Sequence, residues 1–343
     1  MQRIVKALII LDVCFFLCIA GGCRAENPEG GTPAKQEKSE EKASPEQGED
    51  KTSSGREEDK MSSEQGEDKT SSGREEGKEE PGPADGAVAA GLTDPEGMTL
   101  ETRVKPPEGY ARAEADKGSL CAFMREYALK EAGSPVLLYD GSRKGNQDAH
   151  QAVFALPIEA EDLQQCADSV MRVYAEYFRE TGQKEKIGFH FVNGFYAEYA
   201  RWRDGYRIRV DGSGAAWTKS AGYDDSDENF RKYLRMVFSY AGTLSMEAES
   251  EQIPLSDLAC GDVFLKGGNP GHVVLVADVC ENEEGQKAFL LAQGYMPAQE
   301  FHLLKNPLHD EDPWYYEREV EYPFVTPEYT FPEGSLKRLN YQR

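Results

Sequence analysis

The sequence predicts an α+β domain that follows a long disordered tether, and three observations lead to this fold class. No aromatic residue occurs between Phe16 and Tyr110, so only the chain from about residue 100 onward can build an apolar core. Amphipathic helical patterns come first in that part, and short apolar runs separated by turns follow them. Helices followed by successive strands with short turns are typical of an α+β fold with an antiparallel sheet.

The N-terminus has the features of an export signal that ends at a cysteine. Arg3 and Lys6 precede a largely apolar stretch over residues 7–20, and Ala-Gly-Gly then leads to Cys23. This pattern resembles a bacterial lipobox, so we expect a lipoprotein signal peptide over residues 1–22 and lipid attachment at Cys23. An ordinary secretory signal and an uncleaved anchor are the alternatives. A lipid would hold the chain outside the cytoplasm, at the cell membrane or the outer membrane.

Residues 23–95 form the expected tether. Glu, Lys, Ser, Gly and Pro dominate this segment, and residues 46–58 recur almost unchanged at 64–76. Such a composition buries no apolar surface, so we expect disorder, with an r.m.s. span of about 45 Å over about 70 residues. The tether either lifts the domain off the bilayer or has no selected role. Residues 96–343 then form one globular domain.

Composition also limits the partners and cofactors. The chain carries a net charge of −23, which disfavours contact with phosphate backbones, so we expect no nucleic acid partner. Four cysteines fall in the globular part without a CxxC pair, and we therefore expect no metal site and no cofactor. Up to two disulfides are compatible with these cysteines, and the sequence does not pair them.

The globular part has three helical patterns and four strand patterns. The clearest helix starts near residues 161–162 and carries apolar residues at helical spacing from Leu163 to Phe178. Two further helices are expected over 119–129 and 226–241. Strands are expected over 152–156, 262–265, 272–278 and 288–293, and the last three form an antiparallel unit.

Three residues of these elements form a candidate catalytic set. Cys166 lies near the start of the clearest helix, where the helix dipole favours a thiolate. His272 opens a buried strand after a glycine-rich turn and is positioned to act as a base toward the thiol. Gln293 ends the next strand and can orient the imidazole. Gln164 and Gln165 are candidates for an oxyanion donor.

Each of these residues also has a purely structural interpretation. A cysteine on an apolar helix face is commonly a buried, inert thiol. His272 can bond only to backbone in its turn, Gln299 or a backbone carbonyl can orient its ring instead of Gln293, and the other glutamines can face solvent. We expect structural roles for three further histidines, His150, His190 and His302, with His190 on a strand.

The order of helix-borne Cys, strand-borne His and a polar residue on the next strand resembles that of papain-like cysteine hydrolases. Gly-Asp-Val-Phe at 261–264, Gly-His-Val-Val-Leu-Val at 271–276 and Leu-Leu-Ala-Gln at 290–293 look like the C-terminal sheet of NlpC-type cell-wall peptidases. The resemblance implies a papain-like fold with Cys166 as nucleophile, His272 as base and Gln293 as orienting residue. The chain has Gln-Cys-Ala-Asp where that family usually has Asp-Cys-Ser-Gly, and a long insertion separates Cys166 from His272.

A second resemblance covers roughly residues 105–320. The blocks at 145–150, 162–169, 240–245, 267–272 and 292–299 look like an uncharacterised family of exported bacterial proteins, a domain of unknown function. This resemblance identifies related proteins, but it does not imply a particular reaction. We therefore expect a membrane-anchored thiol hydrolase of the amidase or peptidase type, acting on cell-envelope peptide. The alternatives are a non-catalytic module that binds envelope glycan or a protein partner, and an acyl transferase of the transglutaminase type.

Overall fold

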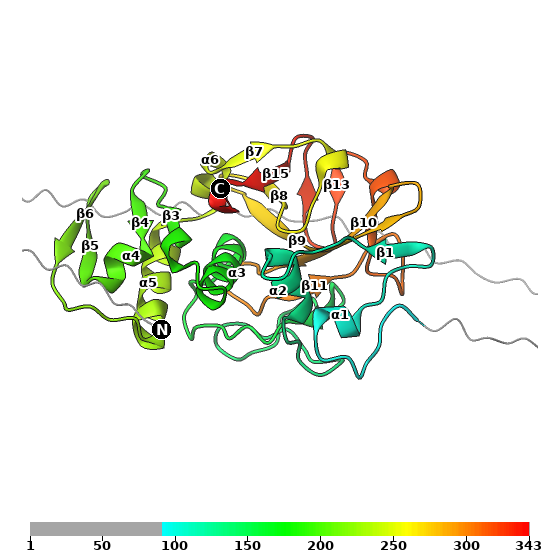
Figure 1. Ribbon diagram of the computed structural model, residues 1–343, viewed down its shortest axis with the longest axis horizontal. Helices are drawn as coiled ribbons and strands as arrows, with labels where there is room; N and C mark the ends of the chain where they lie inside the picture. The colour runs from blue at the N-terminus through cyan, green and yellow to red at the C-terminus, as the bar shows by residue number, and fades with distance from the viewer. Residues whose placement is uncertain (1–90, 343) are drawn as a thin grey trace, which may run out of the picture. The chain divides into compact units, whose positions relative to one another are not determined.

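The protein forms an α+β domain built on a nine-stranded antiparallel sheet with several helices, which confirms the α+β class and the antiparallel sheet expected from the sequence (Figure 1). The computed structural model describes residues 91–342; the expected signal peptide, the lipid site Cys23 and the tether up to residue 90 lie outside the described residues. Seven strands lie side by side in the order β2 (His150–Val153), β11 (His302–Leu304), β10 (Lys287–Gln293), β9 (His272–Asn282), β8 (Val263–Lys266), β15 (Leu336–Leu339) and β7 (Ser250–Gln252). Two short strands complete the sheet, β1 (Tyr110–Arg112) beside β9 and β12 (Tyr315–Tyr316) beside β10.

Strand β9 is the centre of the sheet because it pairs with β8, β10 and β1. Every residue from His272 to Cys280 is buried, as expected for a strand that is covered on both faces. Alternate residues of the sheet enter two separate apolar clusters. One, which includes Val273 and Leu275, packs against the helices, and the other, which includes Val274 and Val276, packs against the C-terminal segments.

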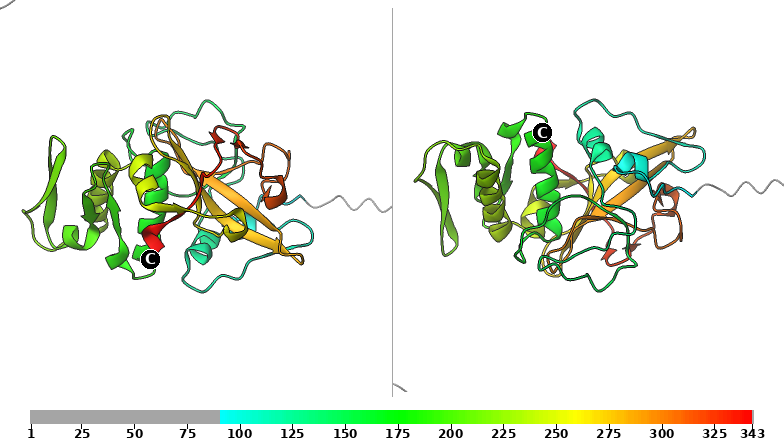
Figure 2. Two further views of the ribbon diagram at one scale, coloured as in Figure 1. Left: turned by 90° about the horizontal axis from the view of Figure 1, so that it is seen from above. Right: turned by 90° about the horizontal axis from the view of Figure 1, so that it is seen from below.

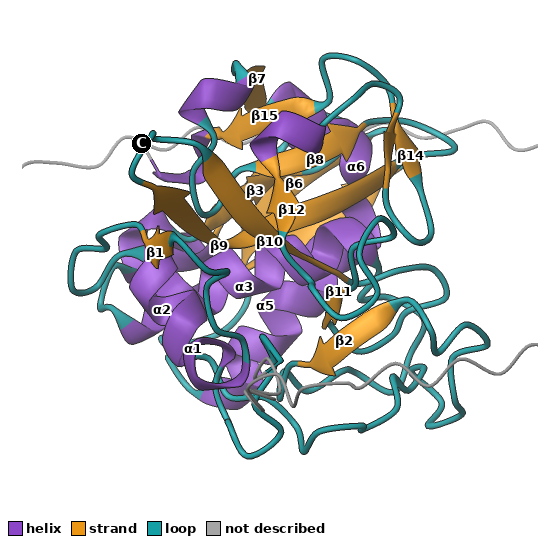
Figure 3. Cartoon of the chain, turned by 90° about the vertical axis from the view of Figure 1, so that its right-hand side faces the viewer, coloured by secondary structure: helices purple, strands orange, loops and turns teal. Residues whose placement is uncertain are grey.

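Several helices begin where the sequence supplies capping side chains. The hydroxyls of Ser119 and Ser226 accept the backbone N–H groups of Ala122 and Asn229 and so start two of them. Figure 3 shows α2 and α3 below the central strands. The helices are α1 (Leu100–Arg103), α2 (Leu120–Glu126), α3 (Cys166–Glu180), α4 (Tyr199–Arg203), α5 (Asp227–Tyr240) and α6 (Thr243–Ala248).

The chain between α3 and α6 forms a separate layer. Seen from above and below, α4, α5 and two hairpins lie on the side of α3 that faces away from the sheet (Figure 2). The hairpins pair β3 (Gly188–His190) with β4 (Tyr196–Glu198), and β5 (Tyr206–Asp211) with β6 (Gly214–Lys219). This layer makes up much of the long segment between Cys166 and His272, and α3 still packs on β9.

The remaining elements are short. A two-stranded unit, β13 (Phe324–Val325) and β14 (Thr330–Phe331), packs on the face of the sheet opposite the helices. The 3-10 turns are η1 (Lys184–Lys186), η2 (Leu255–Asp257), η3 (Glu317–Glu319) and η4 (Asn340–Gln342). Near the start of the described range, the Leu92 carbonyl accepts the N–H of Lys105. Within residues 91–342, no helix has both the length and the apolar composition needed to cross a bilayer.

Candidate active site

A pocket of about 520 Å³ lies where the start of α3 meets the start of β9. Cys166 and His272 both line it, together with Tyr295, Tyr329 and the turn over residues 268–271. The structure therefore brings together the two residues that the sequence suggested as nucleophile and base. Gln293 contacts His272 directly, so the third candidate belongs to the same site.

Antiparallel pairing explains why these residues meet. His272 is the first residue of β9, Gln293 is the last of β10, and His302 is the first of β11. Adjacent strands of an antiparallel sheet run in opposite directions. The start of β9, the end of β10 and the start of β11 therefore lie at the same end of the sheet. The register places Gln293 directly opposite His302. The polar residues at these strand ends thus converge without any long loop to position them.

Two glycines let the backbone pass close to this cluster. A Cβ on Gly271 would lie 2.4 Å from Thr243 Oγ1, and a Cβ on Gly294 would lie 2.3 Å from Ser169 Oγ. Neither glycine has a positive φ, so the requirement is space and not backbone conformation. Glycine next to each of the two strand ends therefore allows α6 and α3 to approach the site.

Cys166 is the first residue of α3, and its side chain is half-buried. Its sulfur lies close to backbone N–H groups of Cys166 itself, Ala167 and Val273, which favour a thiolate. Burial outweighs them and, with the nearby Asp168 carboxyl, raises the pKa of the Cys166 thiol to about 11. The thiol is therefore protonated at neutral pH.

Asp168 lies one helical turn into α3 and is buried. Its Oδ2 accepts the backbone N–H of Gln165 at 3.0 Å, which helps to begin the helix. Burial raises the pKa of Asp168 to about 8, so the carboxyl is largely uncharged at neutral pH. Arg172, four positions further along the helix, donates to Gln164, Glu176 and a backbone carbonyl, and not to Asp168.

His272 is 2 % exposed and is enclosed by aromatic rings. The ring centroids of Tyr295 and Tyr329 lie 4.6 and 4.9 Å from that of His272, and Phe331 stacks on it at 6.0 Å. Burial lowers the pKa of His272 to about 4, although the hydrogen bond to Gln293 opposes this effect. The imidazole is therefore neutral at neutral pH and carries one proton.

The contacts of Gln293 determine which nitrogen of His272 carries that proton. Gln293 Nε2 lies 2.8 Å from Glu328 Oε2 and 3.3 Å from His302 Nε2, and both of these atoms are acceptors. The opposite end of the amide, Oε1, lies 2.7 Å from His272 Nε2 and must accept. His272 therefore carries its proton on Nε2 and has its lone pair on Nδ1.

A buried ion pair lies on the side of the Gln293 amide that faces away from His272. The Lys144 ammonium donates to Glu328 Oε2 and lies 3.3 Å from His302 Nε2. Burial acts to raise the pKa of Glu328, but His302, 3.9 Å away, and Lys144 lower it to about 2. His302 donates from Nδ1 to the Glu300 carbonyl at 2.8 Å, and burial lowers its pKa. Glu328 is thus ionised and His302 neutral, as the hydrogen bonds to Gln293 require.

The two oxyanion candidates differ in position. Gln165 lines the pocket, and its Nε2 donates to Asp162 Oδ1 at 3.1 Å. Gln164 is fully buried, and its Oε1 accepts from Arg172 Nη1 at 2.6 Å. Gln164 is not among the residues that line the pocket. Of the two, only Gln165 has an amide beside the pocket.

Sequence reasoning did not identify Lys144 or Glu328. Lys144 lies in the loop before β2, Glu328 lies in the turn between β13 and β14, and 184 positions separate them in the chain. No spacing pattern connects them, and only the fold brings them together. Of the histidines expected to be structural, His302 belongs to this network, His150 bonds the Ser134 carbonyl, and His190 lines a different pocket.

The other cysteines lie away from this pocket. The thiols of Cys121 and Cys260 contact each other, and Cys121 also lies 3.8 Å from Asp278 Oδ1. Cys280 is buried in the sheet. All four cysteines between residues 91 and 342 are free thiols. The same part of the chain contains no group of three His, Cys, Asp or Glu side chains arranged to hold a metal ion.

Comparison with known proteins assigns this domain to a family. No curated protein and no solved structure matches the chain. One family model does match, that of domain of unknown function 4846 (DUF4846), and the match covers residues 100–338. That range spans nearly the whole described domain, including Cys166, His272, Gln293 and Glu328. Because the match extends over more than half of the chain, the protein belongs to the DUF4846 family.

Proposed function

We propose that this protein is a thiol hydrolase of the amidase or peptidase type, with a papain-like arrangement of Cys166, His272 and Gln293. The observation that carries the proposal is the hydrogen bond from His272 to Gln293 at the wall of the pocket that Cys166 lines. It leaves the lone pair of the imidazole on Nδ1, the ring nitrogen that the Gln293 amide does not contact. A buried, oriented base beside a thiol is the requirement for nucleophilic catalysis by cysteine.

In the proposed reaction, the Cys166 sulfur attacks the carbonyl carbon of an amide while His272 Nδ1 takes the thiol proton. The C–N bond then breaks, and the imidazolium returns the proton to the leaving amine. Water attacks the resulting thioester, again with His272 as base, and releases the acid and the thiol. Because the thiol has a pKa of about 11 and the imidazole one of about 4, the resting pair is neutral. The thiol proton of Cys166 is therefore transferred to His272 while the sulfur attacks the carbonyl carbon, and not before that attack.

The start of α3 supplies groups suited to the developing oxyanion. The backbone N–H groups of Cys166 and Ala167 belong to the first turn of the helix and have no partner within it. The Gln165 side chain is the second donor in this proposal, once it exchanges its bond to Asp162 for one to substrate. Gln164, bound to Arg172 outside the pocket, has no role in it.

We propose cell-envelope peptide as the substrate because the N-terminal pattern suggests export and lipid attachment at Cys23. The tether would then let the domain reach material away from the bilayer. Metabolic labelling with an alkyne fatty acid tests the anchor. Label in the full chain that is lost in Cys23→Ala supports it, and equal label in both proteins contradicts it.

Hydrolysis of cell-wall peptides by the full chain tests the activity. New amines released from a mixture of muropeptides should appear with the unmodified protein and disappear in Cys166→Ala and His272→Ala. Cys280→Ala is the matched control because Cys280 lies in the sheet away from the pocket. Release that persists in Cys166→Ala would overturn the proposal.

One observation favours a second candidate, a non-catalytic binding module on the same scaffold. The high pKa of Cys166 keeps its thiol protonated at neutral pH, as in a structural cysteine. In that case envelope peptides bind without being cleaved, and binding survives Cys166→Ala. The hydrolysis assay and a binding assay with the same peptides distinguish the two candidates.

A further inference from the structure

A second and larger pocket, of about 690 Å³, lies outside the candidate active site. Strands β3 and β4, helix α6 and the C-terminal turn η4 line it, and it shares no lining residue with the pocket of Cys166. Thr243 of α6 belongs to the first pocket, whereas Leu244 and Ser245 of the same helix belong to the second. The two pockets therefore have separate linings beside one short helix.

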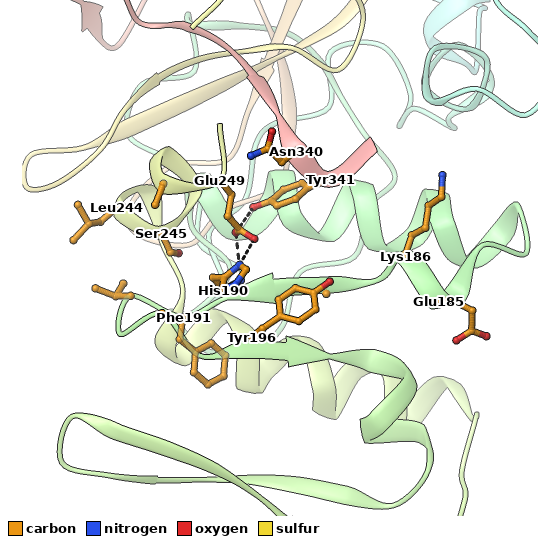
Figure 4. Close-up of a pocket in the computed structure, with 14 residues that line it drawn as sticks. Glu185, Lys186, His190, Phe191, Tyr196, Leu244, Ser245, Glu249, Asn340 and Tyr341 are labelled. Atoms are coloured by element: carbon orange, nitrogen blue, oxygen red, sulfur yellow. Dashed lines mark hydrogen bonds and ion pairs between the residues drawn. The ribbon is translucent and has the colours of Figure 1, made fainter. Parts of the chain in front are cut away.

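His190 lies at the polar centre of the second pocket, and the largely buried carboxylate of Glu249 fixes the position of its ring. Figure 4 shows Glu249 reaching the imidazole and the Tyr341 hydroxyl reaching the same carboxylate. His190 Nδ1 donates to Glu249 Oε1 at 2.6 Å, and Tyr341 Oη lies 3.3 Å from Glu249 Oε2. The Glu249 side chain is 11 % exposed, whereas that of His190 is 41 % exposed. The ring is thus fixed through Nδ1, and Nε2 is left for a ligand.

A flat aromatic surface lies next to this imidazole. Tyr196 pairs with His190 across β3 and β4, and their ring centroids are 4.7 Å apart with a 35° tilt. A Cβ on Gly188 would lie 2.3 Å from Tyr196 Oη and 2.5 Å from Cζ. The absence of a side chain at Gly188 therefore leaves the space in which the Tyr196 ring packs against β3. Tyr196 is nevertheless 40 % exposed.

This combination matches the chemistry of a sugar. One side of a pyranose ring presents C–H groups, which are attracted to the negative face of an aromatic ring. Its hydroxyls both donate and accept, so they can bond His190 Nε2 whether the imidazole is neutral or charged. Apolar surface with a few fixed polar groups is the usual composition of a small-molecule site. Two carboxylates, of Glu185 and Glu249, line the pocket against the single ammonium group of Lys186, and this balance disfavours an anionic ligand.

We propose that this second pocket binds a saccharide ring, with the sugar stacked on Tyr196 and a hydroxyl bonded to His190. The site is independent of the proposed hydrolase activity because its residues are different. A saccharide-binding site would hold the domain on a glycan-containing surface. It would do so whether or not the Cys166 pocket cleaves anything.

Saturation-transfer NMR on the full chain, with the β-1,4-linked trimer of N-acetylglucosamine as the probe, tests this proposal. Saturation should reach the C–H protons of one sugar face most strongly. Tyr196→Ala should weaken binding at least tenfold, and Tyr196→Phe should retain it. Gly188→Ala should also weaken binding, because the new methyl group displaces the tyrosine ring. Thermal unfolding of each variant identifies any loss of fold.

Two controls separate this site from other effects. Tyr223 is a more exposed tyrosine, at 66 %, and does not line the pocket, so Tyr223→Ala should bind the trimer normally. Cys166→Ala should also bind normally, which makes the outcome independent of the hydrolase test. Absence of saturation transfer to the trimer, or binding that survives Tyr196→Ala in a folded variant, would overturn the proposal. Capture of a tyrosine-containing dipeptide in place of the sugar would overturn it as well.

Discussion

The Oε1 atom of Gln293 lies 2.7 Å from Nε2 of His272, and the other end of the same amide faces an ionised carboxylate. An amide turned by 180° would place its oxygen against Glu328, where two acceptors would repel each other. The orientation of one side chain therefore determines the tautomer of the imidazole next to it. The Lys144–Glu328 ion pair determines the tautomer indirectly, through the Gln293 amide that lies between it and His272.

Loss of the Gln293 amide should impair the base without unfolding the site. Gln293→Leu removes the acceptor for His272 Nε2–H and frees the ring to adopt the other tautomer. We expect about a hundredfold slower acylation of Cys166 by an activated peptide ester, within the range for losing an oriented base. Gln299→Leu is the matched control, because Gln299 is equally buried and donates only to the Pro297 carbonyl. Equal rates in both variants would contradict the role of Gln293.

Removal of Glu328 should destabilise the fold, because Lys144 is only 6 % exposed and would lose its counter-ion. Glu328→Ala is expected to lower the free energy of unfolding by about 3–5 kcal/mol, as measured by urea denaturation. Lys144→Met combined with Glu328→Leu removes both charges and should recover much of that loss. For comparison, Glu185→Ala removes a carboxylate that is 76 % exposed from its ion pair with Arg203, which keeps Asp225 nearby, and should cost less than about 1 kcal/mol. Similar losses for Glu328→Ala and Glu185→Ala would show that burial of the pair is unimportant.

Asp168 should make the stability of the domain depend on pH. Its pKa is about 8 in the folded protein and about 3.9 in an unfolded chain. The folded state therefore binds the proton more tightly, and its contribution to stability is full below about pH 4 and is lost as the pH rises through 8. The slope reaches at most about 1.4 kcal/mol per pH unit. Asp168→Asn should flatten this slope between pH 5 and 8 in urea titrations, and an unchanged slope would exclude Asp168 as its source.

The contact between Cys121 and Cys260 should make these two thiols the most readily cross-linked pair. Treatment with glutathione disulfide oxidises the two thiols to a disulfide and yields two molecules of reduced glutathione. Peptide mapping should find Cys121 joined to Cys260, with Cys166 and Cys280 still alkylatable after denaturation. Cys121→Ser should abolish the cross-link and leave Cys260 with at most a mixed disulfide. A different pairing in the unmodified protein would mean that the two thiols are not neighbours in solution.

Several elements of the site could be predicted because they lie in regular structure. Apolar periodicity predicted α3, and apolar runs with short turns predicted β8, β9 and β10. Since adjacent antiparallel strands share an end, the meeting of His272 and Gln293 followed from the strand order. The start of α3 was less accurate. The helix begins at Cys166 and not near residues 161–162, since the N–H groups of Leu163 and Gln165 bond within turns before it.

Other parts of the site depend on contacts that no local pattern contains. Lys144 and Glu328 are polar residues in loops, where the sequence suggests solvent exposure, and both are largely buried by segments far away in the chain. Of the aromatic rings around His272, Tyr295 comes from the loop between β10 and β11 and Tyr329 from the turn between β13 and β14, and either could equally have formed part of the core. His190 was expected on a strand, where it lies, but its partner Glu249 is 59 positions away.

The most direct test of the proposed catalytic role is the rate at which Cys166 is acylated by a peptide p-nitrophenyl ester, compared between the unmodified chain and His272→Ala. We expect a thioester on the peptide containing Cys166, formed at least a hundredfold faster when His272 is present. The rate should fall as the pH drops through about 4, where His272 becomes protonated. Equal rates in the two proteins, or acylation confined to other cysteines, would contradict the account.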